Sequence, residues 1–240
     1  MHVAPAEVAS ELAPNGRLRA AINLGNPVLA QQAPDGALTG VTVDLATLLA
    51  HELGVTLELL AYKSGGAVVR GLGEDEWDVA FVANEPERAQ KLRFAAPYIL
   101  IEATYMVGAD GPADVADVDR AGTSIAVGNG AAYHLILGRL LKHAELVLAE
   151  TSAAAIDMFA AGGAAAVAGV RQTLLAAQSA IPGARVMDGH FSTIEQALAI
   201  PGDGSDAALA AIDAFCAERK KDGSIAEALA KSGQQGVRII

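Results

Sequence analysis

Arg88 is the first residue whose chemistry stands out in the sequence. It follows the short apolar run Asp78–Val82, in the segment Glu85-Pro86-Glu87-Arg88. A guanidinium offers parallel donors that match a carboxylate, and it stays charged at neutral pH. A plainer interpretation makes Arg88 a solvated surface residue that pairs with Glu85 or Glu87. On these residues alone, the plainer interpretation is favoured.

The turn Gly128-Asn129-Gly130 is a second place where the chain could bind an anion. It precedes a helical segment that begins with Ala131 and Ala132. Backbone amides at the start of a helix attract negative groups, because their N–H donors lack partners within the helix. The two alanines leave these amides accessible but supply no side-chain donor. The alternative is an ordinary strand–helix turn.

Two asparagines could hydrogen-bond a ligand. Asn26 lies in the turn Gly25-Asn26-Pro27, and Asn84 follows the apolar run that contains Val82. Both could instead be plain turn residues, which asparagine favours because its side chain bonds to nearby backbone.

Three further charged residues lie beside apolar segments. Glu102 interrupts the run Ile99–Val107, where a buried carboxylate would be costly unless it is paired; the alternative is an exposed edge position. Arg171 lies at the start of a helical segment and faces either a ligand or the outside of that helix. Glu195 opens a further apolar run.

No motif indicates catalysis or a cofactor. The chain lacks a nucleophile elbow, a phosphate-binding loop, a zinc-protease motif and a dinucleotide fingerprint. His134, His143 and His190 do not have the spacing of metal ligands. Cys216 is the sole cysteine, which excludes an intrachain disulfide and predicts a buried hydrophobe. We therefore assign no catalytic residue, no metal ligand and no cofactor.

The elements that position these residues alternate between strands and helices. Apolar runs and helical periodicity predict, in chain order, strands at 18–24, 55–61, 78–82, 99–107, 124–127, 146–148, 164–168, 185–187 and 195–200. Helices are predicted between and after them, at 43–53, 65–72, 131–141, 152–161, 170–179, 206–221 and 224–231. The segment 83–98 is predicted as a polar loop, and 109–116 as a linker. This order predicts α/β units with parallel sheets.

Composition and charge restrict the class of protein. Hydrophobic residues make up 52% of the 240 residues and charged residues 19%, which is enough to form sizeable cores. The net charge of -11 argues against nucleic acid or an anionic membrane surface as a partner. No apolar run reaches the length of a membrane span, and no signal peptide is visible. We expect a periplasmic protein if a leader was removed, and a cytoplasmic one if the sequence is the full native chain.

The order and spacing of these segments resemble the bacterial extracellular solute-binding proteins, family 3, from about Leu18 to Ser232. The matching stretches are LRAAINLGN (18–26), GVTVDLATLLAHEL (40–53), WDVAFVANEPERAQKLRFAAPY (77–98), IAVGNGAA (125–132) and FCAERKKDGSIAEA (215–228). The resemblance implies a two-lobed, type II periplasmic-binding-protein-like α/β fold, with a mixed, mainly parallel sheet in each lobe. Lobe 1 would comprise 1–107 and 197–240, and lobe 2 would comprise 108–196. Two hinge crossings, 105–109 and 196–200, would let the lobes close over a ligand.

The resemblance also implies roles for several residues. In the family, an arginine at the place of Arg88 makes a bidentate pair with the ligand's α-carboxylate, so Arg88 is the strongest candidate. The place of Asn26 often holds an aromatic residue that covers the ligand, and that of Asn84 a hydroxyl or small residue. Threonine or serine is frequent where this chain has Ala131 and Ala132.

One departure from the family concerns the ligand's amine. Amino-acid binders usually carry an aspartate after the strand equivalent to 164–168, and this aspartate pairs with the ammonium group. The stretch 168–171 has no acid. If Arg171 faces the ligand, two arginines favour a dianion or an acid without an amine. Otherwise Glu102 or Glu195 must pair with an ammonium group.

We therefore expect a solute-binding protein, not an enzyme, that closes around a small carboxylate-bearing metabolite, an amino acid or related organic acid. Its expected partners are that ligand and an ABC transporter permease. We expect a monomer, with no nucleic-acid partner and no direct membrane insertion. Two alternatives are an enzyme that resembles cyclohexadienyl dehydratase, with Glu102 or Glu195 as general acid, and a cytoplasmic ligand sensor.

Overall fold

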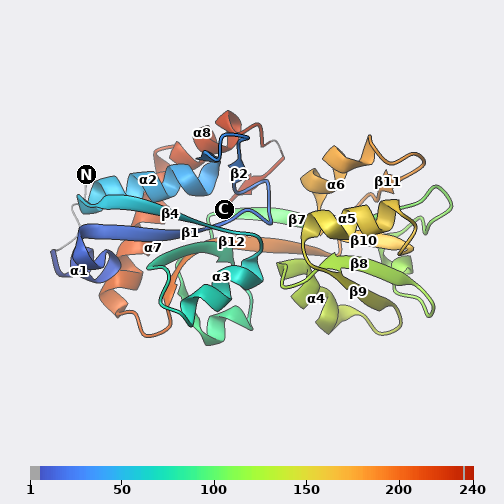
Figure 1. The fold of residues 1–240 in the computed structure, drawn as a ribbon, viewed down its shortest axis with the longest axis horizontal. Coiled ribbons are helices and arrows are strands. Elements are labelled where there is room, and N and C mark those ends of the chain that lie inside the picture. The colour runs from blue at the N-terminus through green and yellow to red at the C-terminus, as the bar shows by residue number, and fades with distance from the viewer. Residues whose placement is uncertain (1–5, 235) are drawn as a thin grey trace. The chain divides into compact units, whose positions relative to one another are not determined.

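The chain divides into two compact units. The computed structural model describes residues 6–234 and 236–240, so residues 1–5 of the predicted first lobe lie outside the described residues. Unit 1 runs to Leu100 and resumes at Glu195–Ile240, and unit 2 comprises Ile101–Ile194. Two strands, β7 (Ile99–Val107) and β12 (Ser192–Pro201), carry the chain from one unit to the other (Figure 1). The lobe boundaries that the resemblance implies fall at the end of β7 and within β12.

Unit 1 is built on a mainly parallel sheet. Besides β12 and the start of β7, its strands are β1 (Arg17–Asn23), β2 (Gln31–Gln32), β3 (Leu38–Thr39), β4 (Thr56–Tyr62), β5 (Val79–Ala83), β6 (Leu92–Phe94) and β13 (Arg238–Ile239). Strand β1 lies between β4 and β5 and is parallel to both. Strand β12 pairs antiparallel with β5 and β6, β13 pairs with the start of β7, and β2 and β3 form a separate hairpin.

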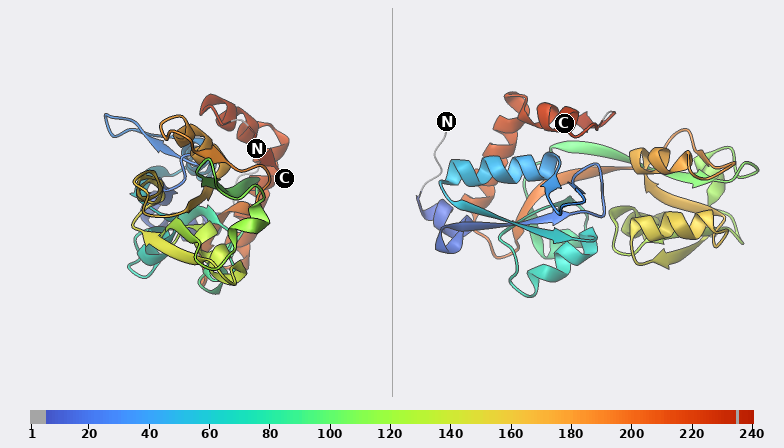
Figure 2. Two further views of the ribbon diagram at one scale, coloured as in Figure 1. Left: turned by 90° about the vertical axis from the view of Figure 1, so that its right-hand side faces the viewer. Right: turned by 45° about the horizontal axis from the view of Figure 1, so that its top comes forward.

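Helices cover both faces of the unit 1 sheet (Figures 1 and 2). They are α1 (Ala6–Leu12), η1 (Pro14–Gly16), α2 (Val41–Leu53), α3 (Gly65–Leu72), η2 (Arg88–Gln90), α7 (Asp206–Lys221) and α8 (Ser224–Lys231). Helix α2 ends at Gly54, whose φ of 68° is a conformation that glycine adopts easily. Helix α3 begins after Ser64, whose Oγ accepts a hydrogen bond from Ala67 N at 3.1 Å.

The core on the α3 side of this sheet follows from strand alternation. Ala21 on β1 and Ala80 and Val82 on β5 pack with Val68 of α3 and with Trp77. Successive side chains of a strand point to opposite faces, so the intervening residues of these buried strands face the other layer of helices. The small side chains of β1 and β5 allow α3 to lie close to the sheet.

Unit 2 is a smaller sheet of the same kind. With the rest of β7, its strands are β8 (Ser124–Gly128), β9 (Glu145–Ala149), β10 (Ala166–Val170) and β11 (Arg185–Val186). The order is β7, β10, β8, β9, in which β10, β8 and β9 are parallel and β7 is antiparallel to β10. Strand β11 pairs with β7.

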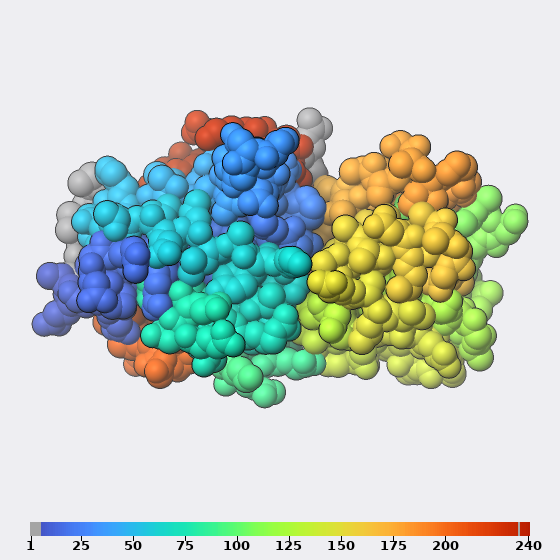
Figure 3. All heavy atoms as spheres, viewed as in Figure 1, coloured from blue at the N-terminus to red at the C-terminus, as the bar shows by residue number. Residues whose placement is uncertain are grey.

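Helices of unit 2 close over its strands. They are η3 (Val115–Val118), α4 (Ala132–Leu140), α5 (Ser152–Ala160) and α6 (Arg171–Gln178). Phe159 of α5 packs with Met106, Val167 and Leu174 in one core cluster. In Figure 3 the yellow atoms of the α5 segment lie on the face of unit 2 that is turned to the viewer.

The predicted α/β class is confirmed, and four elements have the predicted bounds: α3, β7, α7 and α8. Two predictions are wrong in detail. The segment predicted as a loop at 83–98 contains β6, because three residues there pair with β12. The strand predicted at 164–168 lies at 166–170, where its register is fixed by pairing with β8 and β7. The short elements α1, β2, β3 and β13 were not predicted, since two-residue strands and a seven-residue helix carry little periodicity.

Candidate functional site

Arg88 is buried in unit 1, against the start of α3. Only 4% of the residue is exposed. Its Nη1 donates a hydrogen bond to Ala83 O, at the end of β5, over 3.2 Å. A Cβ placed on Gly65 would lie 2.7 Å from Nη2, so the guanidinium lies directly against the backbone of α3. Arg88 is therefore not the solvated surface residue of the plainer interpretation.

Burial changes the proton affinity of Arg88. Loss of hydration lowers the pKa of its guanidinium to about 10, and the carboxylates of Glu85 and Glu87 act in the opposite direction. Glu85 is itself 5% exposed. Arg88 remains a cation at neutral pH, and a buried cation is costly unless anionic groups stabilise it. A carboxylate ligand would add to that stabilisation.

The loop that follows β1 packs against the residues before α3. A Cβ on Gly25 would lie 2.6 Å from Lys63 O, so only glycine fits there. Asn23 Oδ1 accepts from Gly25 N at 3.0 Å, and Asn26 Oδ1 accepts from Val28 N at 3.2 Å. These are turn-forming contacts of the kind that asparagine favours. Asn26 thus shapes the turn, and its contact with a ligand stays a prediction.

Asn84 and Glu195 are neighbours in unit 1. Asn84 follows β5 directly, and its backbone N donates to Glu195 O at 2.9 Å. Glu195 lies on β12 with an exposed side chain, and Asn84 is half-buried. The structure therefore brings together three candidates at the end of β5, namely Arg88, Asn84 and Glu195. The roles of the last two towards a ligand stay predictions.

The predicted anion-binding turn of unit 2 does lead into a helix, and a histidine caps it. Gly130 has a φ of 72° and donates its N–H to His134 Nδ1 at 3.0 Å. This bond requires Nδ1 to be unprotonated, which puts the proton of the neutral ring on Nε2. Ala131 occupies the N-cap without a side-chain cap, and Ala132 begins α4. Sequence reasoning missed the role of His134, although its four-residue spacing from Gly130 is the signal that could have revealed it.

A hydroxyl group that sequence reasoning did not assign also lies beside this turn. A Cβ on Gly128 would lie 2.7 Å from Ser152 N, so the turn packs against the start of α5. Ser152 Oγ accepts a hydrogen bond from Tyr133 OH at 2.6 Å. Ser152 thus supplies a hydroxyl near the place where Ala131 and Ala132 lack one.

Arg171 and Glu102 pair with each other inside unit 2. Arg171 Nε lies 2.6 Å from Glu102 Oε2. Its Nη1 donates to Met187 O at 3.0 Å, and its Nη2 donates to Gly189 O. Glu102 Oε1 also lies 3.5 Å from His190 Nδ1. The acid that interrupts β7 is therefore paired, and Arg171 is anchored to the 187–190 turn.

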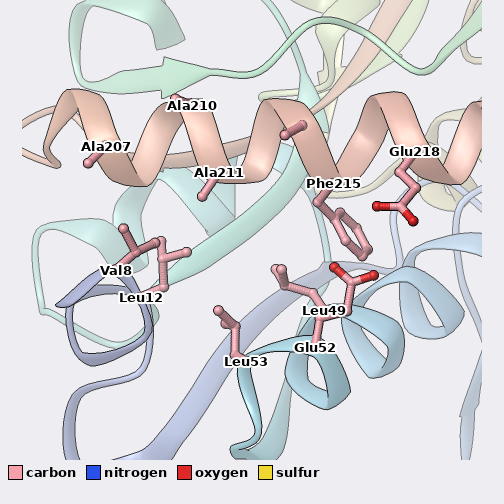
Figure 4. A pocket seen from close by; sticks show the side chains of 11 residues that line it. Val8, Leu12, Leu49, Glu52, Leu53, Ala207, Ala210, Ala211, Phe215 and Glu218 are labelled. Atoms are coloured by element: carbon pink, nitrogen blue, oxygen red, sulfur yellow. The ribbon is translucent and has the colours of Figure 1, made fainter. Parts of the chain in front are cut away.

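A separate apolar pocket of about 260 Å³ lies on unit 1 between α1, α2 and α7 (Figure 4). Its walls are aliphatic, and Glu52 and Glu218 lie at one end near Phe215. Arg219 Nη2 pairs with both carboxylates, at 3.2 Å and 3.1 Å. None of the candidate ligand residues lines this pocket.

Within residues 6–234 and 236–240, no cluster of three or more histidine, cysteine or acidic side chains could hold a metal ion. Over the same part of the chain, no helix combines the length and the apolar character that a membrane span requires.

The arrangement of parallel strands with ligand candidates at their carboxyl ends is that of a type II periplasmic binding protein. A family model agrees: residues 18–235 match the bacterial extracellular solute-binding proteins, family 3. The chain belongs to this family. No curated protein matches the sequence closely enough to count as a relative.

Solved structures show the same fold. An arginine-binding protein of T. maritima, as a P235GK mutant, has a TM-score of 0.80 and 22% identity, over 95% of this chain and 100% of that one. A solute receptor for L-cysteine of Neisseria gonorrhoeae has a TM-score of 0.81 and 21% identity, over 93% and 92%. An ancestral amino-acid-binding protein, a precursor of cyclohexadienyl dehydratase, has a TM-score of 0.78 and 25% identity, over 93% and 98%.

Proposed function

We propose that the protein binds a small carboxylate-bearing metabolite, an amino acid or related organic acid, and delivers it to an ABC transporter permease. The burial of Arg88 at the end of β5 carries this proposal. A guanidinium that is 4% exposed and has a pKa lowered to about 10 gains more from a carboxylate partner than a solvated one would. Family membership and the amino-acid-binding neighbours support the same class of ligand.

The ligand itself can be found by a thermal-shift screen of the purified protein. The probes are the twenty amino acids, dicarboxylates, keto acids and aromatic acids. A ligand that binds only the folded state raises the melting temperature by mass action. A hit among amino acids would assign Glu102 or Glu195 to the ammonium group, and a hit only among acids without an amine would exclude that pairing. The absence of any hit would contradict the proposal.

Arg88→Ala should abolish binding of the ligand found in that screen. Loss of a buried, hydrogen-bonded charge pair costs about 2–5 kcal/mol, which is a loss of affinity of at least about thirtyfold. Isothermal titration calorimetry measures the affinity, and circular dichroism checks that the fold is retained. Arg70→Ala, an exposed arginine in the last turn of α3, is the matched control and should leave the affinity unchanged. Unchanged affinity in Arg88→Ala would reject Arg88 as the carboxylate ligand.

We favour binding over turnover because the chain belongs to a family of solute-binding proteins. Glu102, one of the two candidates for a general acid, is held by Arg171 at 2.6 Å. Incubation of the protein with a cyclohexadienyl acid, followed by detection of an aromatic product, tests the enzyme alternative directly.

A further inference from the structure

Gly65 is the residue whose surroundings depend most directly on Arg88. It is the first residue of α3 and is buried. A Cβ at this position would meet three atoms of one guanidinium: Nη2 at 2.7 Å, Cζ at 3.1 Å and Nη1 at 3.2 Å. The first distance is shorter than real Cβ contacts allow, so the planar group of Arg88 fills the space where any other residue would place its side chain.

No backbone requirement explains glycine at position 65. Its φ is not in the left-handed region, unlike that of Gly130 or Gly54, so an L-residue could adopt the same conformation. Glycine also disfavours a helix relative to alanine. The Ser64 cap supports the helix start without help from Gly65. The contact with Arg88 is therefore the feature that favours glycine here.

The guanidinium is the part that must yield if a Cβ is added. The chain before α3 is also held by the close approach of Gly25 to Lys63 O. The Arg88 side chain has flexible torsions, whereas the helix start is fixed by backbone packing and the Ser64 cap. A methyl group at position 65 would therefore displace the guanidinium while the fold survives.

We propose that Gly65 is a positioning residue for ligand binding, because the absence of its side chain sets the place of the Arg88 guanidinium. This inference rests on the proposed role of Arg88 in carboxylate binding. It predicts that Gly65→Ala impairs binding without touching the ligand, and that the effect of the methyl group depends on Arg88.

The binding test compares three glycine-to-alanine variants by calorimetry with L-arginine, L-cysteine and succinate as probes. For each probe that binds the wild-type protein, Gly65→Ala should lower the affinity at least tenfold. Gly71→Ala is a change in the same helix, where a Cβ would lie 2.7 Å from Tyr62 OH and 2.6 Å from Glu76 Oε2. Gly138→Ala lies in α4 with open space around it. Both controls should stay within about twofold of the wild type. An equal loss in Gly71→Ala would attribute the effect to α3 as a whole and overturn the proposal.

The second test needs no ligand. Gly65→Ala is made in the wild type and in the Arg88→Ala variant, and the melting temperatures of all four proteins are compared. Each background gives one change in melting temperature caused by Gly65→Ala. This change should be more favourable by about 3 °C or more in the Arg88→Ala background than in the wild type. The same shift in both backgrounds would overturn the proposal. If no compound of the thermal-shift screen binds the wild type, the proposed function fails, and this comparison of melting temperatures still decides the geometry.

Discussion

Two arginines of this protein have opposite surroundings. Arg88 is buried among backbone groups and the carboxylates of its own segment, and desolvation lowers its pKa to about 10. Arg171 is partly exposed and donates hydrogen bonds to Glu102 and to two carbonyl groups of the 187–190 turn. The charge of Arg171 is thus compensated within unit 2, which leaves Arg88 as the stronger candidate for a ligand carboxylate.

Arg171→Ala should act on stability more than on binding. The variant loses the pair with Glu102 and the bonds to the 187–190 turn, so we expect the free energy of unfolding to fall by about 1 kcal/mol. Affinity for the ligand should change less than about threefold, since the lost charge was already paired. Arg120→Ala, which removes an exposed pair with Asp117, is the control and should be neutral. A loss of affinity confined to dicarboxylates would instead place Arg171 at the ligand.

Cys216 should be unreactive in the native protein. It is 1% exposed, and burial raises the pKa of its thiol to about 12, with Asp213 acting in the same direction and Lys220 against it. The thiolate is the reactive form, so at pH 8 only about one molecule in ten thousand would carry it. Labelling with a thiol reagent should be complete in urea and negligible without it. Rapid labelling of the folded protein would contradict the burial of Cys216.

At the scale of elements, short connections position the candidate site within unit 1 and order a connection within unit 2. In unit 1, Gly25 lets the loop after β1 pack against Lys63 O, and Gly65 lets the start of α3 pack against the Arg88 guanidinium. Arg88 also donates a hydrogen bond to Ala83 O at the end of β5. In unit 2, Asp119 follows η3 and organises the connection between α4 and β9. Its carboxylate accepts hydrogen bonds from the backbone N–H groups of Lys142, His143 and Ala144, at 2.9, 2.8 and 2.8 Å.

Asp119→Asn should lower the melting temperature in a pH-dependent way. The backbone N–H groups of Ala144 and Lys142 hold the pKa of Asp119 below its usual value. A carboxyl group whose pKa is lower in the folded state stabilises the protein above the unfolded pKa, and this stabilisation is lost as pH falls through the folded pKa. The difference between wild type and variant should be full at pH 7 and should shrink below about pH 4. Asp114→Asn, whose side chain makes no cap at η3, serves as the control and should show no such trend.

At the scale of the whole molecule, each unit has its own hydrophobic core and its own set of parallel strands. Loops at the carboxyl ends of parallel strands are free to vary without disturbing these cores, because the strands and helices already bury the apolar surface. This separation explains how the family fold is retained at 21–25% identity to proteins whose ligands differ.

Ligand binding should stabilise the folded chain by a predictable amount. A ligand present at one hundred times its dissociation constant contributes about 2.7 kcal/mol, which corresponds to roughly 5–10 °C in the melting temperature. The shift should grow with the logarithm of ligand concentration, and at the same concentration it should fall to about a third or less in Arg88→Ala. An undiminished shift in that variant would indicate a binding site elsewhere on the molecule.

Local sequence patterns were sufficient for most of the fold. The strand–helix alternation is encoded in apolar runs and helical periodicity, so α3, β7, α7 and α8 were predicted with their observed bounds. Family membership was also predictable, because it depends on the order and spacing of short segments. Elements such as β6 and β13 were not, because they exist only through pairing with β12 and β7.

For the site, the order of residues along the chain already showed which chemical groups were available: an arginine after β5, a glycine turn before α4, and no acid after β10. The surroundings of these residues depend on the tertiary fold. It buried Arg88 against Gly65, which lies 23 residues earlier, and it paired Arg171 with Glu102 across 69 residues. The reason is physical: burial and charge pairing depend on which segments meet in space, and no local pattern records a contact between residues so far apart in the chain.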